Sequence, residues 1–72
     1  MDLAENKASG RHFIVLEDAG DGRFRLITPE GKIKRLERRL FDPPVQVDPE
    51  VMGTEYCLTQ PQVARYENHT AE

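Results

Sequence analysis

The segment Thr28-Pro29-Glu30-Gly31-Lys32 constrains the fold more than any other part of this sequence. Proline fixes φ for the first central position of a type I turn, and the glycine two residues later supplies the left-handed residue that closes a short hairpin loop. Apolar and polar residues alternate at the start of residues 23–28, which is typical of a strand. The sequence therefore predicts a β-hairpin that turns at Pro29-Glu30-Gly31.

A helix over residues 29–41 is the alternative to this hairpin. Pro29 suits the first position of a helix, and three apolar residues recur at helical spacing, namely Ile33, Leu36 and Leu40. Against the helix, Gly31 would fall inside the first turn, where it costs about 1 kcal/mol relative to alanine. The hairpin is favoured, and a combination of the two is a strand through Leu36 followed by a helical turn near residues 37–41.

The rest of the chain adds several short elements. Strands are predicted over residues 12–16, 45–47 and 54–58, a glycine-rich turn over 18–22, and a short helix over 60–66 that begins after Thr59. Residues 1–10 are interpreted as a flexible arm and residues 67–72 as a disordered tail. The prediction is one small, mostly β domain over residues 11–66, an SH3-like or OB-like barrel of four to five short strands.

Composition limits where such a chain would act. Cys57 is the only cysteine, so no internal disulfide can form, and a small secreted domain would normally need one. The first residues lack the features of a signal peptide, and no apolar run approaches the length of a membrane span. A cytoplasmic setting follows as an expectation, with Cys57 as a small buried hydrophobic residue.

Charge is distributed unevenly along the chain. The formal net charge is −3, but residues 11–41 hold eight lysines and arginines against five acids. Residues 42–72 hold one arginine against six acids. The middle of the chain is therefore basic and its C-terminal part acidic, and this asymmetry is more informative than the total.

The register of the predicted hairpin concentrates the basic residues. If Thr28 lies opposite Lys32, then Arg25 faces Arg35, and alternation places Arg23 on the same face, with Ile27 and Ile33 near the turn. Two arginines in direct opposition repel each other, and an anion would relieve the repulsion. That anion is either a phosphate or a carboxylate of the chain itself, for which Glu37, Asp42 and the acidic C-terminal part are the candidates.

The opposite face of the hairpin is predicted to point to the core. It carries Phe24, Leu26 and Leu36, with Lys34 at its edge. In the helical turn that follows, Arg38 and Arg39 are expected to point outward while Leu40 and Phe41 pack inward.

Three segments of the chain resemble a known family. These are Gly10-Arg11-His12-Phe13-Ile14-Val15-Leu16, Phe24-Arg25-Leu26-Ile27, and Gly31-Lys32-Ile33-Lys34-Arg35-Leu36-Glu37. Over these residues, 10–37, the chain resembles small KOW-type proteins related to one class of ribosomal proteins. The resemblance implies an SH3-like barrel that binds RNA.

Together these features predict a binding module rather than an enzyme. The histidines and the cysteine lack metal-site spacing, and the apolar residues are too few for a substrate cavity of ordinary enzyme size, so no cofactor, metal or small-molecule substrate is expected. The predicted partner is a nucleic acid, RNA rather than DNA, bound by Arg11, Arg23, Arg25, Lys32, Lys34, Arg35, Arg38 and Arg39. The alternative is a protein partner at a sheet edge or at a surface of Ile27 and Ile33.

Overall fold

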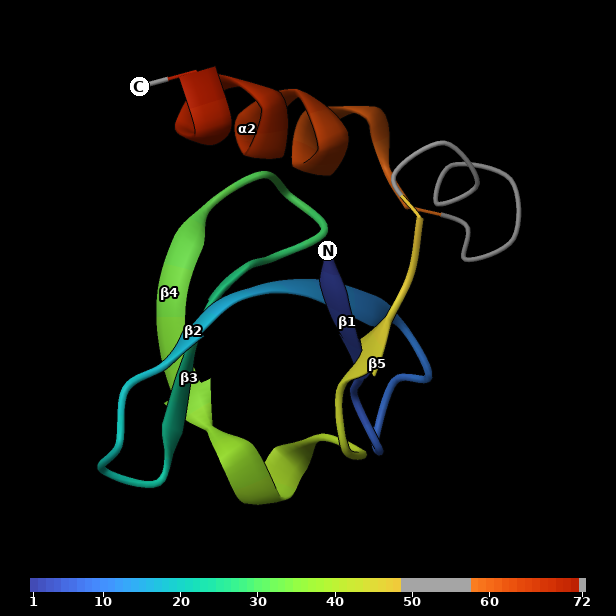
Figure 1. Ribbon diagram of the computed structural model, residues 1–72. Helices are drawn as coiled ribbons and strands as arrows, with labels where there is room; N and C mark the ends of the chain where they lie inside the picture. Colours follow the sequence, from blue (N-terminus) through green and yellow to red (C-terminus); the bar gives the residue numbers. More distant parts are fainter. Residues whose placement is uncertain (49–57, 72) are drawn as a thin grey trace.

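The computed structural model describes residues 1–48 and 58–71. They form a five-stranded antiparallel sheet in the order β4-β3-β2-β1-β5, one short 3-10 helix and one C-terminal α-helix (Figure 1). The elements are β1 (Asp2–Glu5), β2 (His12–Asp18), β3 (Arg23–Ile27), β4 (Ile33–Glu37), η1 (Arg38–Leu40), β5 (Val45–Gln46) and α2 (Gln60–Ala71). The mostly β prediction is confirmed.

The predicted hairpin is present, in the predicted register. The Thr28 N–H donates to the Lys32 carbonyl at 2.8 Å, and Gly31 closes the turn with φ of 83°. Leu26 lies opposite Lys34, and Arg25 lies opposite Arg35. A strand through Glu37 followed by η1 is close to the combination that the sequence allowed. Gly31 adopts a left-handed conformation, which a helix starting at Pro29 could not contain.

The N-terminal segment corrects one prediction. Residues 1–10 were predicted to be a flexible arm, but Asp2–Glu5 forms β1, an inner strand that pairs with both β2 and β5. Leu3 and Ala4 are completely buried. Two adjacent apolar residues give little periodicity, yet as neighbours in a strand they point to opposite faces and contribute to the core on each side of the sheet.

Each face of the sheet carries its own apolar cluster. On one face Ala4, Phe24 and Leu26 pack with Phe41, which follows η1. On the other face lie Leu3, Ile14 and Ile27, with Leu58 and Tyr66 from the C-terminal segment packed against them. Figure 1 shows η1 and α2 on opposite sides of β2.

Phe41 is buried as predicted, but the prediction for Leu40 is wrong. Leu40 is 42% exposed, whereas Phe41 is 4% exposed. A single 3-10 turn of three residues can direct only part of its circumference toward the sheet. The Phe41 ring takes that place, with its centroid 5.1 Å from the Phe13 ring and 6.2 Å from the Phe24 ring.

The C-terminal helix is longer than predicted. The predicted helix ended at residue 66 and a disordered tail followed, but α2 continues to Ala71. At its start the Gln62 N–H donates to the Thr59 hydroxyl, and the Gln62 side-chain oxygen accepts from the Thr59 N–H, each at 3.3 Å. This capping box confirms the predicted start of the helix after Thr59.

Gln62 also fixes α2 to the sheet. Its side chain is 1% exposed, and its amide nitrogen donates to the carbonyls of His12 at 3.0 Å and Ile27 at 3.1 Å. The Thr59 hydroxyl donates to the Pro29 carbonyl in the hairpin turn. Polar contacts of this kind need complementary geometry, so they fix the position of α2 on the sheet. Tyr66 of the same helix packs on the apolar face of the sheet.

After η1 the chain returns along β1. Phe41 bridges Asn6, and the predicted strand over residues 45–47 appears as β5, which pairs with Asp2 and Leu3. The sheet is open, with β4 and β5 at its two edges, and no ladder joins those edges within residues 1–48 and 58–71. Closure into a barrel is therefore not shown. The predicted strand over 54–58 lies outside the described residues except for Leu58, as does Cys57.

Candidate nucleic-acid interface

Three of the predicted basic residues share one face of the hairpin. Arg23 and Arg25 on β3 and Arg35 on β4 alternate onto the face that also carries Ile27 and Ile33. We call these three side chains the outer arginine face. Arg23 and Arg35 are exposed, and the Arg25 side chain is 38% exposed.

An acid of the chain itself partly neutralises this face. Glu17 lies opposite Arg25, and its carboxylate is 3.7 Å from the guanidinium. Arg23 lies opposite Glu37 in the β3–β4 ladder. The hairpin register does not predict Glu17 as a partner of Arg25, because a register shift between Val15 and Glu17 sets its position. A bulge of this kind re-aims a side chain and has no clear sequence signal here.

Arg38 belongs to a different surface. Its guanidinium is 2.6 Å from the Asp18 carboxylate and lies over the Phe24 ring, 5.6 Å from the ring centroid. Phe24 faces the core on the side of the sheet away from the outer arginine face. Arg39, at 2.5 Å from Glu37, is likewise ion-paired within the chain.

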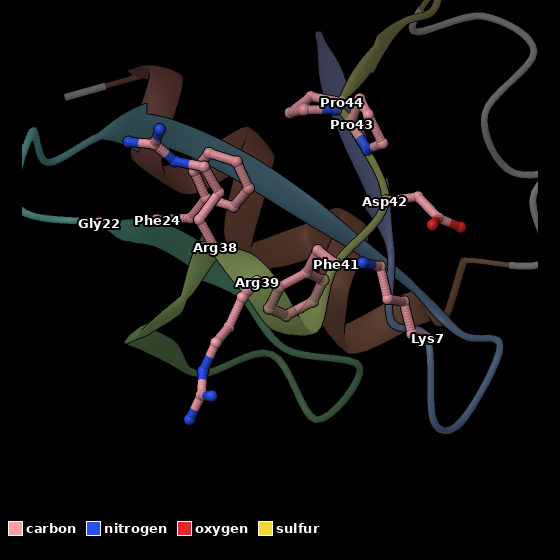
Figure 2. Close-up of a pocket in the computed structure, with 9 residues that line it drawn as sticks. All are labelled: Lys7, Gly22, Phe24, Arg38, Arg39, Phe41, Asp42, Pro43 and Pro44. Carbon is pink, nitrogen blue, oxygen red and sulfur yellow. The ribbon is translucent and has the colours of Figure 1, made fainter.

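A surface hollow of about 530 Å³ lies next to these two arginines. Phe24 and Phe41 contribute to its lining, and Figure 2 shows the Lys7 side chain extending along Phe41, whereas the Asp42 carboxylate points the other way. The hollow is open to solvent, unlike the concave sites that bury most of the surface of a small-molecule ligand. The hollow forms at the surface beside residues 38–44 and needs no extra core residues.

Arg11 and Lys34 lie together at a second hollow, of about 420 Å³, on the same side of the sheet. Glu30 also lines it. The pKa of the Glu30 carboxyl is lowered, first by hydrogen bonds from its own N–H and from the Thr28 hydroxyl, and then by the charges of Arg11 and Lys34. Glu30 thus places a carboxylate near both cations.

The structure therefore divides the eight predicted basic residues. Arg23, Arg25 and Arg35 form the outer arginine face, while Arg11, Lys34, Arg38 and Arg39 line the two hollows on the other side. Lys32 is exposed beside the turn, and its N–H donates to the Thr28 hydroxyl. Lys7, in the segment predicted to be a flexible arm, lines the hollow beside Phe41 because it directly follows β1 and its N–H donates to the Leu40 carbonyl.

The apolar surface suggested for a protein partner is covered. Ile27 is completely buried, and Ile33 packs against the same cluster as Leu58 and Tyr66. The prediction of an exposed Ile27 and Ile33 surface is therefore wrong. The hairpin register alone could not reveal this, because the covering residues lie more than twenty positions further along the chain.

Two acidic side chains near the predicted basic residues, Asp18 and Glu30, make the stability of the fold depend on pH. The hydrogen bond from the Gly20 N–H, together with the Arg38 guanidinium, lowers the pKa of Asp18, and the pKa of Glu30 is lowered as described above. A carboxyl whose pKa is lowered by folding stabilises the fold fully above its unfolded pKa, and this stabilisation is lost as the pH falls through the folded value. The relevant unfolded values are 3.8 for Asp18 and 4.5 for Glu30.

We expect the midpoint of thermal unfolding to fall as the solution is acidified below about pH 4.5, the upper of the two unfolded values. Circular dichroism melts between about pH 7 and pH 3 would measure it. The double variant Asp18→Asn, Glu30→Gln removes both titrations, so its melting temperature should depend less on pH. An unchanged pH dependence in that variant would contradict the assignment.

Within the described residues, no group of three or more histidine, cysteine, aspartate or glutamate side chains is placed to hold a metal ion. Among the helices of residues 1–48 and 58–71, none has the length and apolar character needed to cross a membrane.

Comparison with known proteins gives no relative of this chain: no family model, curated protein or solved structure matches it.

Proposed function

We propose that this chain is a small non-catalytic module that binds nucleic acid through the outer arginine face, and that it acts in the cytoplasm. RNA is proposed over DNA on the basis of the resemblance of residues 10–37 to KOW-type proteins. The cytoplasmic setting rests on the single cysteine.

One observation carries the proposal. Arg25 and Arg35 lie directly opposite each other in the β3–β4 ladder, at a cost of a few tenths to about 1 kcal/mol relative to a neutral pair. Glu17 pairs with Arg25, while Arg35 has no carboxylate within ion-pair distance among the described residues. A phosphate placed between the two guanidinium groups would relieve the repulsion and meet their planar donor geometry.

The position of α2 supports the same interpretation. The C-terminal segment packs against Ile27 and Ile33, at the turn end of the hairpin, through Tyr66 of α2 and Leu58 before it. Over residues 58–71 the charged side chains are Arg65 and Glu67, apart from any charge on His69, so this segment brings no net acid to the sheet. Phosphate contacts without base readout would make binding sensitive to salt and tolerant of sequence.

The proposal can be tested by fluorescence anisotropy with a labelled single-stranded oligouridylate. Three phosphate contacts on a single strand give a slope of about −2 in a plot of log K against log salt, which is a loss of about 20-fold between 50 and 200 mM salt. Arg35→Glu should weaken binding by about tenfold or more, because it removes one contact and adds a repulsive charge.

Arg65→Glu on α2 is the matched control, since it makes the same change of charge at an exposed residue outside the outer arginine face. It should leave affinity nearly unchanged. No binding at 50 mM salt, or equal losses in both variants, would contradict the proposal. A duplex DNA that binds more tightly than the oligouridylate would contradict the preference for RNA.

A further inference from the structure

The outer edge of β4 is the longer of the two edges of the sheet. β4 has five residues and β5 has two. In an antiparallel ladder, alternate residues exchange backbone hydrogen bonds with the neighbouring strand, and the residues between them point their N–H and C=O groups away from it. The register of the β3–β4 hairpin decides which residues of β4 point outward.

Two hydrogen bonds at the ends of the hairpin fix this alternation. The Thr28 N–H donates to the Lys32 carbonyl, and the Arg38 N–H donates to the Gly22 carbonyl, each at 2.8 Å. Between these two pairs, Lys34 and Leu36 direct their backbone groups toward β3. The residues that direct theirs outward are therefore Ile33, Arg35 and Glu37.

No strand of residues 1–48 pairs with this edge of β4. The Glu37 carbonyl caps η1, so the groups left for a new strand are those of Ile33 and Arg35 and the Glu37 N–H. They are spaced as the donors and acceptors that an added antiparallel strand would need, and addition of a strand to such an edge is a common mode of peptide binding. Figure 1 shows β4 at the side of the molecule opposite β5, with its outer edge facing away from the other strands.

The charge of the β4 edge indicates what charge an added strand should carry. Residues 32–37 hold three basic side chains against Glu37, and Glu37 is paired with Arg39. Pairing with a second copy of β4, centred on Arg35, would place Arg35 opposite Arg35 and oppose two basic strands, which is unfavourable. An acidic strand would instead place carboxylates opposite Lys34 and Arg35.

We propose that the β4 edge binds an extended acidic segment of a partner protein by antiparallel strand addition. Opposite Ile33 and Leu36 the segment carries apolar residues, because both side chains are half-buried and extend the apolar clusters on the two faces of the sheet. Opposite Lys34 and Arg35 it carries glutamate or aspartate. This inference goes beyond the proposed nucleic-acid function, and the β4 edge shares Arg35 with the outer arginine face.

The probe is a blocked synthetic peptide, Lys-Val-Glu-Glu-Val-Asp, in which the two glutamates lie opposite Arg35 and Lys34. Titrated into the ¹⁵N-labelled full-length chain, it should shift the amides of Ile33, Arg35 and Glu37 more than other amides of the sheet. Arg35→Gln should weaken binding by no more than about fivefold, since one cross-strand charge pair contributes up to about 1 kcal/mol.

Backbone methylation of the peptide separates strand addition from simple charge attraction. N-methyl groups on the peptide residues whose N–H groups point toward β4 should weaken binding by at least about tenfold, because each methyl group removes a donor and blocks close approach. N-methyl groups on the intervening residues leave those donors intact and should have much less effect. The protein is unchanged in this comparison, so folding does not affect it.

Three outcomes would overturn the inference. One is equal binding of the two methylated peptides, since that would show attraction by charge alone. Another is the absence of amide shifts along β4 at about 1 mM peptide, the weak end of measurable affinity. The third is an oligouridylate that shifts the amides of Ile33, Arg35 and Glu37 as strongly as the peptide does, which would assign the edge to nucleic acid.

Discussion

Replacing Leu3 with alanine is expected to lower the free energy of unfolding by about 2–5 kcal/mol. The Leu3 side chain is completely buried and packs with Ile14 and Ile27 beneath the C-terminal segment. Its removal costs the transfer free energy of the lost methyl groups and leaves a cavity, because the paired strands on either side of β1 restrict how far the site can collapse. A domain of 72 residues has little stability to lose, so the variant should be largely unfolded near body temperature.

Leu40→Ala provides the matched control, since it makes the same chemical change at a leucine that is 42% exposed. Its effect should stay below about 1 kcal/mol. Urea denaturation followed by circular dichroism measures both variants on one scale. If the two leucines proved equivalent, β1 would not be part of the core, and the flexible arm predicted from the sequence would be the better description.

The hairpin could be predicted from the sequence because its signals are local. Pro29 and Gly31 meet the backbone requirements of one turn type, and that turn fixes the pairing of every residue in β3 and β4. The position of Arg25 opposite Arg35 then follows from counting residues back from the turn. The start of α2 was predictable for the same reason, since Thr59 and Gln62 form a cap within four residues.

The features that were missed depend partly on distant residues. β1 is short, and two of its four residues are acidic; it is a strand because β2, which follows it in the chain, and the distant β5 pair with it on its two sides. The hairpin alone predicts an exposed Ile27, whereas Leu58 and Tyr66 cover its face. The contacts of β1 with β5 and of Ile27 with Leu58 and Tyr66 span more than the window of about 11–18 residues over which periodicity is read, so no local pattern predicts them.

The candidate interface likewise has features that the sequence predicts and features that it does not. The sequence identified which residues are basic and which of them share a face of the hairpin, but not which acids accompany them. Glu17 lies near Arg25 because of a bulge in β2. Asp18 precedes the β3–β4 hairpin and Arg38 follows it, yet the two side chains form an ion pair beside Phe24. A count of charges over residues 11–41 therefore overstates the number of cations available to a partner.

The second large effect is expected for Gly31→Ala, which should destabilise the chain by about 2–4 kcal/mol. Gly31 has φ of 83°, a conformation that costs an alanine about 1–2 kcal/mol. In addition, a Cβ atom at this position would lie 2.8 Å from the Pro61 carbonyl oxygen in the first turn of α2. That contact is too short to persist, so the substitution must displace either the hairpin turn or the helix that packs against it.

Gly20→Ala separates the two contributions. Gly20 has φ of 82°, but a Cβ atom there would have nothing within 4 Å, so this variant carries only the backbone cost. The difference between the two variants measures how firmly α2 is seated on the hairpin. Hydrogen exchange of the Gln62 backbone amide gives a second readout, because displacement of the helix should expose it in Gly31→Ala and not in Gly20→Ala. Equal destabilisation with unchanged protection at Gln62 would show that the hairpin and α2 are not coupled through this contact.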